Sequence, residues 1–207
     1  MTAPAVNTPP PAPAPEPGPL TLIRQDLART TTIFTGSRLG VFIECVRQPG
    51  VLAVMTFRLG HWLTSQGLLT KIVLKPLYML LDHHARAQWG IQIQDGARIA
   101  GGFHIHHFGG IFVSGYAVIG ENFTLGHDVT IGAGGEGARR GAPHIGSNVV
   151  VGSGAKLYGK VQIGSNVKIA PNSVIDKNIP DNVIVHPAPV QVIRFPGLTG
   201  PAETAAG

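Results

Sequence analysis

Aliphatic residues recur at every sixth position through the second half of the chain, with two interruptions. A period of six matches neither an α-helix, which repeats every 3.6 residues, nor a lone strand, which repeats every two. It is typical of a parallel β-helix, in which each repeated side chain points inward and stacks on the one a coil below. Burying such a side chain contributes roughly 1.5–3 kcal/mol. The thirteen repeated positions are Ile93, Ile99, Ile105, Val113, Ile119, Leu125, Ile131, Ile145, Val151, Leu157, Ile163, Ile169 and Ile175.

The two interruptions follow Ile105 and Ile131, where the next repeated aliphatic is eight and fourteen residues away. Extra residues must leave the wall of the coil, because the buried positions fix its register. Both interruptions are rich in His and Gly. We therefore expect the functional residues there.

Glycine and asparagine mark the expected corners of the coil. Gly often follows the repeated aliphatic, and Asn often stands three places after it, which indicates tight approach of the backbone or a left-handed conformation. These positions are Gly120, Gly126, Gly132, Gly146, Gly152, Gly164, Asn122, Asn148, Asn166 and Asn172.

The rest of the chain divides by composition. Residues 1–19 are rich in Pro and Ala and are predicted to be a disordered tail without the features of a signal peptide. Residues 20–89 are predicted to be helical, 90–190 to form the β-helix, and 191–207 to be a loose tail. Within the helical region we expect helices over 20–32, 51–64 and 68–88, and we place Cys45 in a helix as a small buried residue.

No run of 18 uninterrupted apolar residues occurs, so no membrane span is expected. Peripheral membrane contact by residues 68–81 stays open beside the alternative that these helices pack on each other or on a second subunit. The net charge of +5 comes without a block of Lys or Arg, so nucleic acid is not an expected partner. One Cys excludes an intrachain disulfide and suits a reducing compartment, so we expect a cytoplasmic protein, with the inner face of the membrane as an alternative place.

The histidines at the interruptions are the candidate reactive groups. Ile105 points inward, so His104 and His106 should face outward, while His107 lies in the extra residues that leave the wall. His127 stands in a hexad between the interruptions, and His144 ends the second one. Imidazole can take a proton from an alcohol near neutral pH. One alternative is a zinc site, although the ligand spacing of the γ-type carbonic anhydrases, which bind zinc through three histidines, is not reproduced here. The other alternative is that these histidines are solvent-exposed loop residues without a function.

Four motifs between Val51 and Arg194 resemble the serine acetyltransferase branch of the hexapeptide acyltransferases. They are Arg58-Leu59-Gly60-His61-Trp62, Gly90-Ile91-Gln92-Ile93, His106-His107-Phe108-Gly109-Gly110 and Val129-Thr130-Ile131-Gly132-Ala133. The resemblance implies an all-β main domain, a left-handed parallel β-helix preceded by a short α-helical region. It also implies a homotrimer that binds acetyl-CoA between subunits, and no metal is expected.

Two positions depart from the serine enzymes. His106 replaces an Asp, and Gly141-Ala142-Pro143 lacks a His that the family carries there. The pattern at Pro143-His144-Ile145-Gly146 is more similar to exopolysaccharide O-acetyltransferases of the colanic acid type. We therefore expect a sugar of an exopolysaccharide or its lipid-linked precursor as the acceptor. Serine is the alternative acceptor, and a non-catalytic β-helix scaffold or binding module is the alternative of another class.

The resemblance also assigns roles to single residues. His107 would be the catalytic base, with His127 and His144 orienting it or the acceptor, and backbone N–H groups of Gly132 to Gly134 would stabilise the oxyanion. Ala133, Ser153 and Pro171 would line the path of the pantetheine arm. The candidates for binding the cofactor phosphates are Lys168, Lys177 and Arg194.

Overall fold

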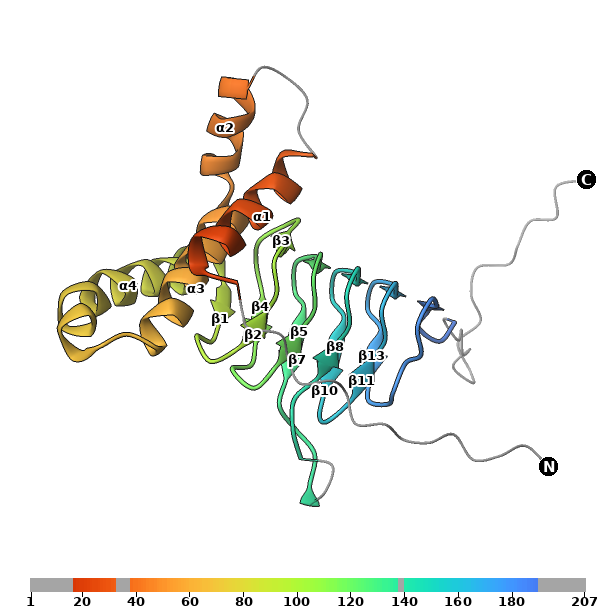
Figure 1. The fold of residues 1–207 in the computed structure, drawn as a ribbon. Helices are drawn as coiled ribbons and strands as arrows, with labels where there is room; N and C mark the ends of the chain where they lie inside the picture. The colour runs from red at the N-terminus through yellow and green to blue at the C-terminus, as the bar shows by residue number, and fades with distance from the viewer. Residues whose placement is uncertain (1–16, 33–37, 138–139, 190–207) are drawn as a thin grey trace, which may run out of the picture.

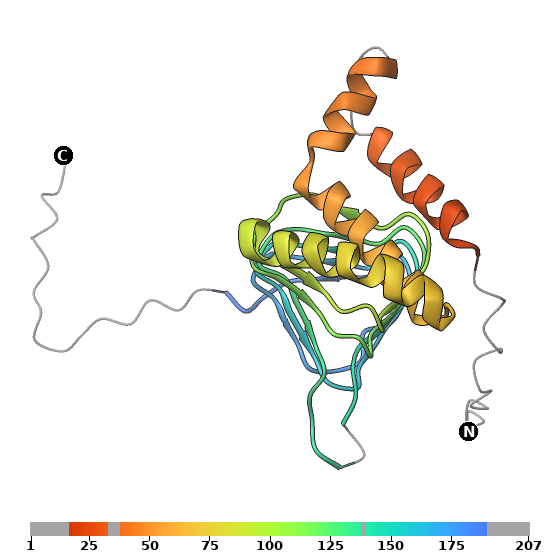
Figure 2. The same cartoon turned by 90° about the vertical axis from the view of Figure 1, so that its left-hand side faces the viewer.

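The computed structural model describes residues 17–32, 38–137 and 140–189. It shows a helical region followed by a triangular parallel β-solenoid of about five turns (Figure 1). The architecture is consistent with the predicted left-handed β-helix of hexapeptide repeats. In Figure 2 the triangular outline of the coils is visible behind the helices that cover one end. The N-terminal tail up to residue 16 and the tail from 190 onward, with Arg194, lie outside the described residues.

The helical region holds α1 (Pro19–Thr31), α2 (Arg38–Arg47), α3 (Pro49–Thr64) and α4 (Leu68–Trp89). The three predicted helices are confirmed to within two residues at each end, and α2 is the helix that contains buried Cys45. Pro49 opens α3 at a position where no backbone N–H is needed. Gly90 ends α4 in the left-handed conformation, with φ of 59°.

The strands stack in parallel on three faces of the solenoid. The first face consists of β1 (Ile91–Ile93), β4 (Ile111–Val113), β7 (Thr130–Gly132), β10 (Lys156–Tyr158) and β13 (Val174–Ile175). The second face consists of β2 (Arg98–Ile99), β5 (Val118–Ile119), β8 (His144–Ile145) and β11 (Gln162–Ile163). The third face consists of β3 (His104–Ile105), β6 (Thr124–Leu125), β9 (Val150–Val151), β12 (Lys168–Ile169) and β14 (Ile184–Val185).

The repeated aliphatics form the core as predicted. All thirteen are at most 5% exposed, and they pair in register from coil to coil, as Ile131 does with Leu157. A second inward column stands two residues before each of them and was not predicted. It includes Phe103 and Phe123, whose rings stack with centroids 5.9 Å apart.

At the corners of the coil, asparagine adopts the left-handed conformation as predicted, whereas glycine allows close approach of neighbouring coils. The four predicted Asn residues have φ between 56° and 58°, and Asn122, Asn148, Asn166 and Asn182 form a ladder of side-chain hydrogen bonds. The glycines that follow the aliphatics serve close approach instead of a positive φ. A Cβ on Gly152 would lie 2.6 Å from the backbone nitrogen of Pro171 in the next coil.

A buried ion pair fastens the helices to the first coil. Arg58 of α3 donates from Nε to Asp26 of α1 at 2.8 Å and also donates to the carbonyls of Ile99 and Ala100. The N–H of Phe103 donates to the same carboxylate. Burial raises the pKa of Asp26, and Arg58 opposes that effect. Three segments far apart in sequence therefore meet at one guanidinium.

Within the described residues, no single helix is long and apolar enough to cross a membrane. The pair Leu39–Cys45 and Pro49–Thr64 meets the length and composition together, but it is bent by 71°.

Candidate active site

One edge of the solenoid, where the third face turns into the first, gathers the first interruption and three predicted site residues. We call His106, His107, His127, Ser153 and Pro171 the histidine edge. Backbone hydrogen bonds join its coils, since the N–H of Gly154 donates to the carbonyl of His127 at 3.0 Å and that of Asn172 donates to Ser153 at 2.9 Å. The parallel register thus aligns residues that lie up to 65 positions apart.

The imidazoles of the histidine edge are exposed and close together. The ring centroids of His106 and His107 lie 4.4 Å apart, and those of His107 and His127 lie 5.9 Å apart. The Nδ1 of His127 lies 3.1 Å from the hydroxyl oxygen of Ser153. An exposed imidazole beside a second, hydrogen-bonded one can accept a proton from a bound alcohol.

His104 does not face solvent as the sequence pattern predicted. It points away from the solenoid core but lies under α1, 7% exposed, with Nδ1 3.2 Å from the hydroxyl oxygen of Thr30. That hydroxyl also lies 3.0 Å from the Asp26 carbonyl, to which it donates, so the Nδ1–H donates to Thr30. The buried Nε2 has no partner among the described residues. Burial, together with His106 and Arg29, lowers the pKa of His104 to about 4.

The second interruption projects as a loop at the opposite edge of the first face, as predicted (Figure 1). Gly134 and Gly141 pair across it, with N–O distances of 2.8 and 3.0 Å. The N–H of Gly134 is therefore not available to an oxyanion, which corrects that part of the prediction. The N–H of exposed Ala133 makes no hydrogen bond within the described residues.

Other predicted residues lie away from the histidine edge of the same chain. His144 is exposed on β8 of the second face. Lys177 lines a groove of about 500 Å³ at the loop edge with Gly135 and Tyr158. Sequence analysis missed Lys156, whose ammonium lies 3.0 Å from Asp128, the residue after His127. Within the described residues, no three His, Cys, Asp or Glu side chains lie together as a metal site would require.

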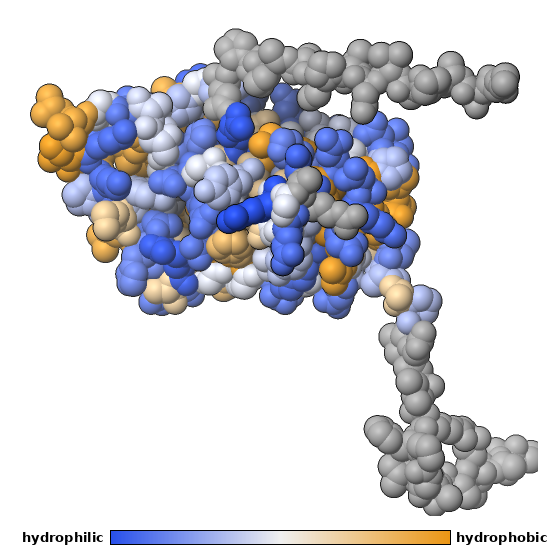
Figure 3. Space-filling model, turned by 90° about the horizontal axis from the view of Figure 1, so that it is seen from below, coloured by the Kyte–Doolittle hydropathy of each residue, from blue (hydrophilic) through white to orange (hydrophobic). Residues whose placement is uncertain are grey.

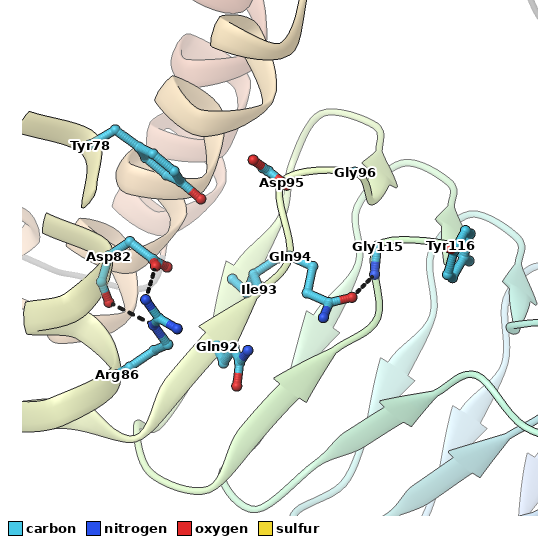
Figure 4. A pocket seen from close by; sticks show the side chains of 10 residues that line it. All are labelled: Tyr78, Asp82, Arg86, Gln92, Ile93, Gln94, Asp95, Gly96, Gly115 and Tyr116. Atoms are coloured by element: carbon cyan, nitrogen blue, oxygen red, sulfur yellow. Dashed lines mark hydrogen bonds and ion pairs between the residues drawn. The ribbon is translucent and has the colours of Figure 1, made fainter. Parts of the chain in front are cut away.

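A polar groove of about 410 Å³ lies between α4 and the first two coils (Figure 4). Its lining includes the ion pair of Asp82 and Arg86, 2.6 Å apart, together with Gln92 and Asp95. Burial, with Asp82 and Asp95 nearby, raises the pKa of the Tyr78 hydroxyl in this groove to about 12. These residues come from three separate segments, and no local motif except Gly90-Ile91-Gln92-Ile93 marked any of them.

Comparison with known proteins identifies relatives of both the helices and the coils. The model of the bacterial transferase hexapeptide (six repeats) matches residues 142–177. The serine acetyltransferase of Helicobacter pylori is 35% identical over 132 residues, which cover 64% of this chain and 74% of the relative. The chain spans about three fifths of the length of the Synechococcus elongatus and Mycobacterium tuberculosis relatives that it also matches.

Two solved structures extend this likeness. Serine acetyltransferase from Brucella abortus in complex with coenzyme A has a TM-score of 0.68 and 30% identity, covering 87% of this chain and 69% of that one. The Neisseria gonorrhoeae enzyme in complex with serine has a TM-score of 0.64 and 28% identity, covering 84% of this chain and 68% of that one.

These findings contradict the expectation of a sugar acceptor. That expectation depended on His106 and on the segment 141–143, whereas the likeness to serine acetyltransferases extends through helices and coils. The two departures, at His106 and at 141–143, are too local to outweigh a likeness that covers most of the chain. The chain belongs to the serine acetyltransferase family of hexapeptide-repeat transferases.

Proposed function

We propose that this protein is an acetyl-CoA-dependent O-acetyltransferase that acts on serine. The observation that carries the proposal is the histidine edge, where exposed His107 stands beside His127 in a chain of the serine acetyltransferase family. A relative crystallised with coenzyme A and another crystallised with serine support the two substrates.

The reaction needs one base and one oxyanion site. His107 takes the proton from the serine hydroxyl as the oxygen attacks the thioester carbonyl. The tetrahedral intermediate then collapses, the carbon–sulfur bond breaks, and the thiolate of coenzyme A takes the proton back from His107. Base catalysis of this kind contributes roughly 10²–10⁴-fold. His127, held by Ser153, positions His107 or the acceptor.

A second subunit would complete the site. Ala133, which offers a backbone N–H to the oxyanion, lies at the other edge of the first face from His107. A homotrimer, as the resemblance implies, would place the loop edge of one subunit against the histidine edge of the next. Acetyl-CoA would then lie in the groove between them, with its arm along Ser153 and Pro171 and its phosphates near Lys177. His144 and Gly132 would also join the site from the neighbouring subunit.

The acceptor pocket is best matched by the groove in Figure 4. Serine is a zwitterion, and the groove presents carboxylates of Asp82 and Asp95 together with the guanidinium of Arg86. The groove lies at the loop edge of the first face, because residues 94–96 and 115–116 follow β1 and β4, so in a homotrimer it would face the histidine edge of the neighbouring subunit. We further propose that the protein works in the cytoplasm, where acetyl-CoA is supplied.

Release of thiol from acetyl-CoA, measured with and without L-serine, tests the proposal. Serine-dependent release supports it, together with O-acetylserine as the product. If coenzyme A does not bind in calorimetry and serine elicits no thiol release, the protein is a β-helix scaffold instead.

A further inference from the structure

The imidazole of His104 is buried at a position where the other coils expose or half-expose a side chain. Hydrophilic residues cover most of the face of the solenoid that Figure 3 shows from below. Among the described two-residue strands, β3 is the one whose residues are both buried, because α1 covers His104. An aliphatic side chain could fill that space without leaving Nε2 unpartnered, so the imidazole calls for a reason other than packing.

Two hydrogen bonds fix the C-terminal end of α1 on the third face of the solenoid. The Nδ1–H of His104 donates to the hydroxyl of Thr30 across 3.2 Å, and Arg29 donates to the hydroxyl of Thr124 at 2.9 Å. Thr124 is the residue of β6 that pairs with His104. The bond to Thr30 sets the orientation of the imidazole ring, which an aliphatic side chain in the same space would not have.

His104 is the first of four imidazoles in a row that continues into the histidine edge. Its ring centroid lies 5.9 Å from that of His106, with the ring planes at 70°. The rings of His106 and His107 are 4.4 Å apart at 72°, and that of His127 follows at 5.9 Å. Edge-to-face contacts of this kind favour one relative orientation of the two rings.

This row is hydrogen-bonded at its two ends and joined by ring contacts in its middle. Thr30 holds His104 at one end, and Ser153 holds His127 at the other. The side chains of His106 and His107 make no hydrogen bond to any residue that the structure describes. The orientation of the His107 ring therefore depends on two anchors, and one of them belongs to α1.

We propose that His104 is a positioning residue for His107: held by Thr30, it fixes the ring of His106, which in turn fixes the ring of the base. Helix α1 is thereby part of the support of the active site. A base that leaves the productive orientation is in place for fewer encounters with the bound alcohol, so loss of the anchor lowers kcat. The inference rests on the proposed function, because it takes His107 as the base.

The variant Thr30→Val tests the proposal, since it removes the hydroxyl that accepts from His104 and nearly keeps the shape of the side chain. We expect kcat to fall roughly three- to tenfold while the KM for acetyl-CoA is unchanged. Thr30→Ser, which keeps the hydroxyl, should restore kcat. The matched control is Thr56→Val on α3, because Thr56 is also buried and also donates to the carbonyl four residues earlier, and it should turn over like wild type.

A double-mutant cycle separates positioning from a general loss of stability. In the His106→Ala background the row is already broken, so Thr30→Val should not lower kcat further. If Thr30 acted only on the stability of the fold, its substitution would lower kcat by the same factor in both backgrounds.

An NMR measurement of the orientation of His107 does not require activity. The Cε1–H resonance of His107, assigned with His107→Ala, should shift or broaden in Thr30→Val and stay in place in Thr56→Val. The proposal is overturned if Thr30→Val keeps the kcat of wild type, if the effects of Thr30→Val and His106→Ala multiply, or if the His107 resonance does not change. Failure of the proposed function differs from this: wild type would release no thiol in response to serine, while the resonance would still report whether Thr30 orients the ring.

Discussion

Replacing buried His104 should remove a large part of the protein's sensitivity to acid. His104 is the first residue of β3, and its side chain packs under α1, where Thr30 accepts a hydrogen bond from the neutral imidazole. A second proton would have to reside on Nε2, which is buried without an acceptor. The variant His104→Gln keeps an amide donor for Thr30 but does not titrate.

The magnitude follows from the pKa values. The pKa of His104 is about 4 in the folded protein against an ordinary value of 6.5. Between these values the unfolded chain binds a proton that the folded chain does not. Stability is therefore fully present above about pH 6.5, falls as the pH approaches 4, and changes no further below it. At about 1.36 kcal/mol per pH unit, the loss assigned to this one group is about 3 kcal/mol.

Urea denaturation at pH 7 and at pH 4, at one fixed protein concentration, measures this loss. The decrease in the free energy of unfolding should be about 3 kcal/mol larger for wild type than for His104→Gln. Other groups titrate in both proteins and cancel in the comparison. Equal decreases would refute the inference that His104 is held neutral by burial under α1.

Three other substitutions probe the fold. Arg58→Ala should lower the free energy of unfolding by about 3–5 kcal/mol in urea denaturation, since it leaves the Asp26 carboxylate buried and unpaired, and Arg58→Met/Asp26→Leu should recover most of that loss. A single variant as stable as wild type would contradict this role. Ile131→Ala should cost about 2–5 kcal/mol by the same assay, and a cost under 1 kcal/mol would argue against its place in the packed core. Gly152→Ala should lower the melting temperature, because the added Cβ meets the backbone of Pro171 at 2.6 Å. The control for loss of a glycine is Gly134→Ala, where φ is not positive and an added Cβ would meet no atom closer than 3.7 Å.

The period of six predicted the coils because one inward column is almost purely aliphatic. The second inward column escaped prediction because it mixes sizes and polarities, from Phe103 to Ala97 and Ser173. His104 shows a further limit of local patterns. Its outward direction followed from the neighbouring Ile105, but its burial depends on α1, which packs there through a contact 74 residues away in sequence.

The candidate site was partly predictable for the same reason. His107, His127, Ser153 and Pro171 fall at the same phase of successive coils, so the parallel register brings them to one edge. His144 lies on the second face of the coil and Lys177 lies at the loop edge, so only an assembly of several chains could bring them to His107. The groove beside α4 combines residues from the helix and two coils, and no spacing in the sequence connects Arg86 with Asp95.

The turnover number of the His107→Ala variant tests the central claim most directly. With acetyl-CoA and L-serine both saturating, removal of the base should lower kcat by roughly 10²–10⁴-fold while coenzyme A still binds in calorimetry. The control His83→Ala removes an exposed imidazole from α4 and should turn over like wild type. A His107→Ala variant with kcat close to that of wild type would contradict the assignment of the histidine edge as the active site.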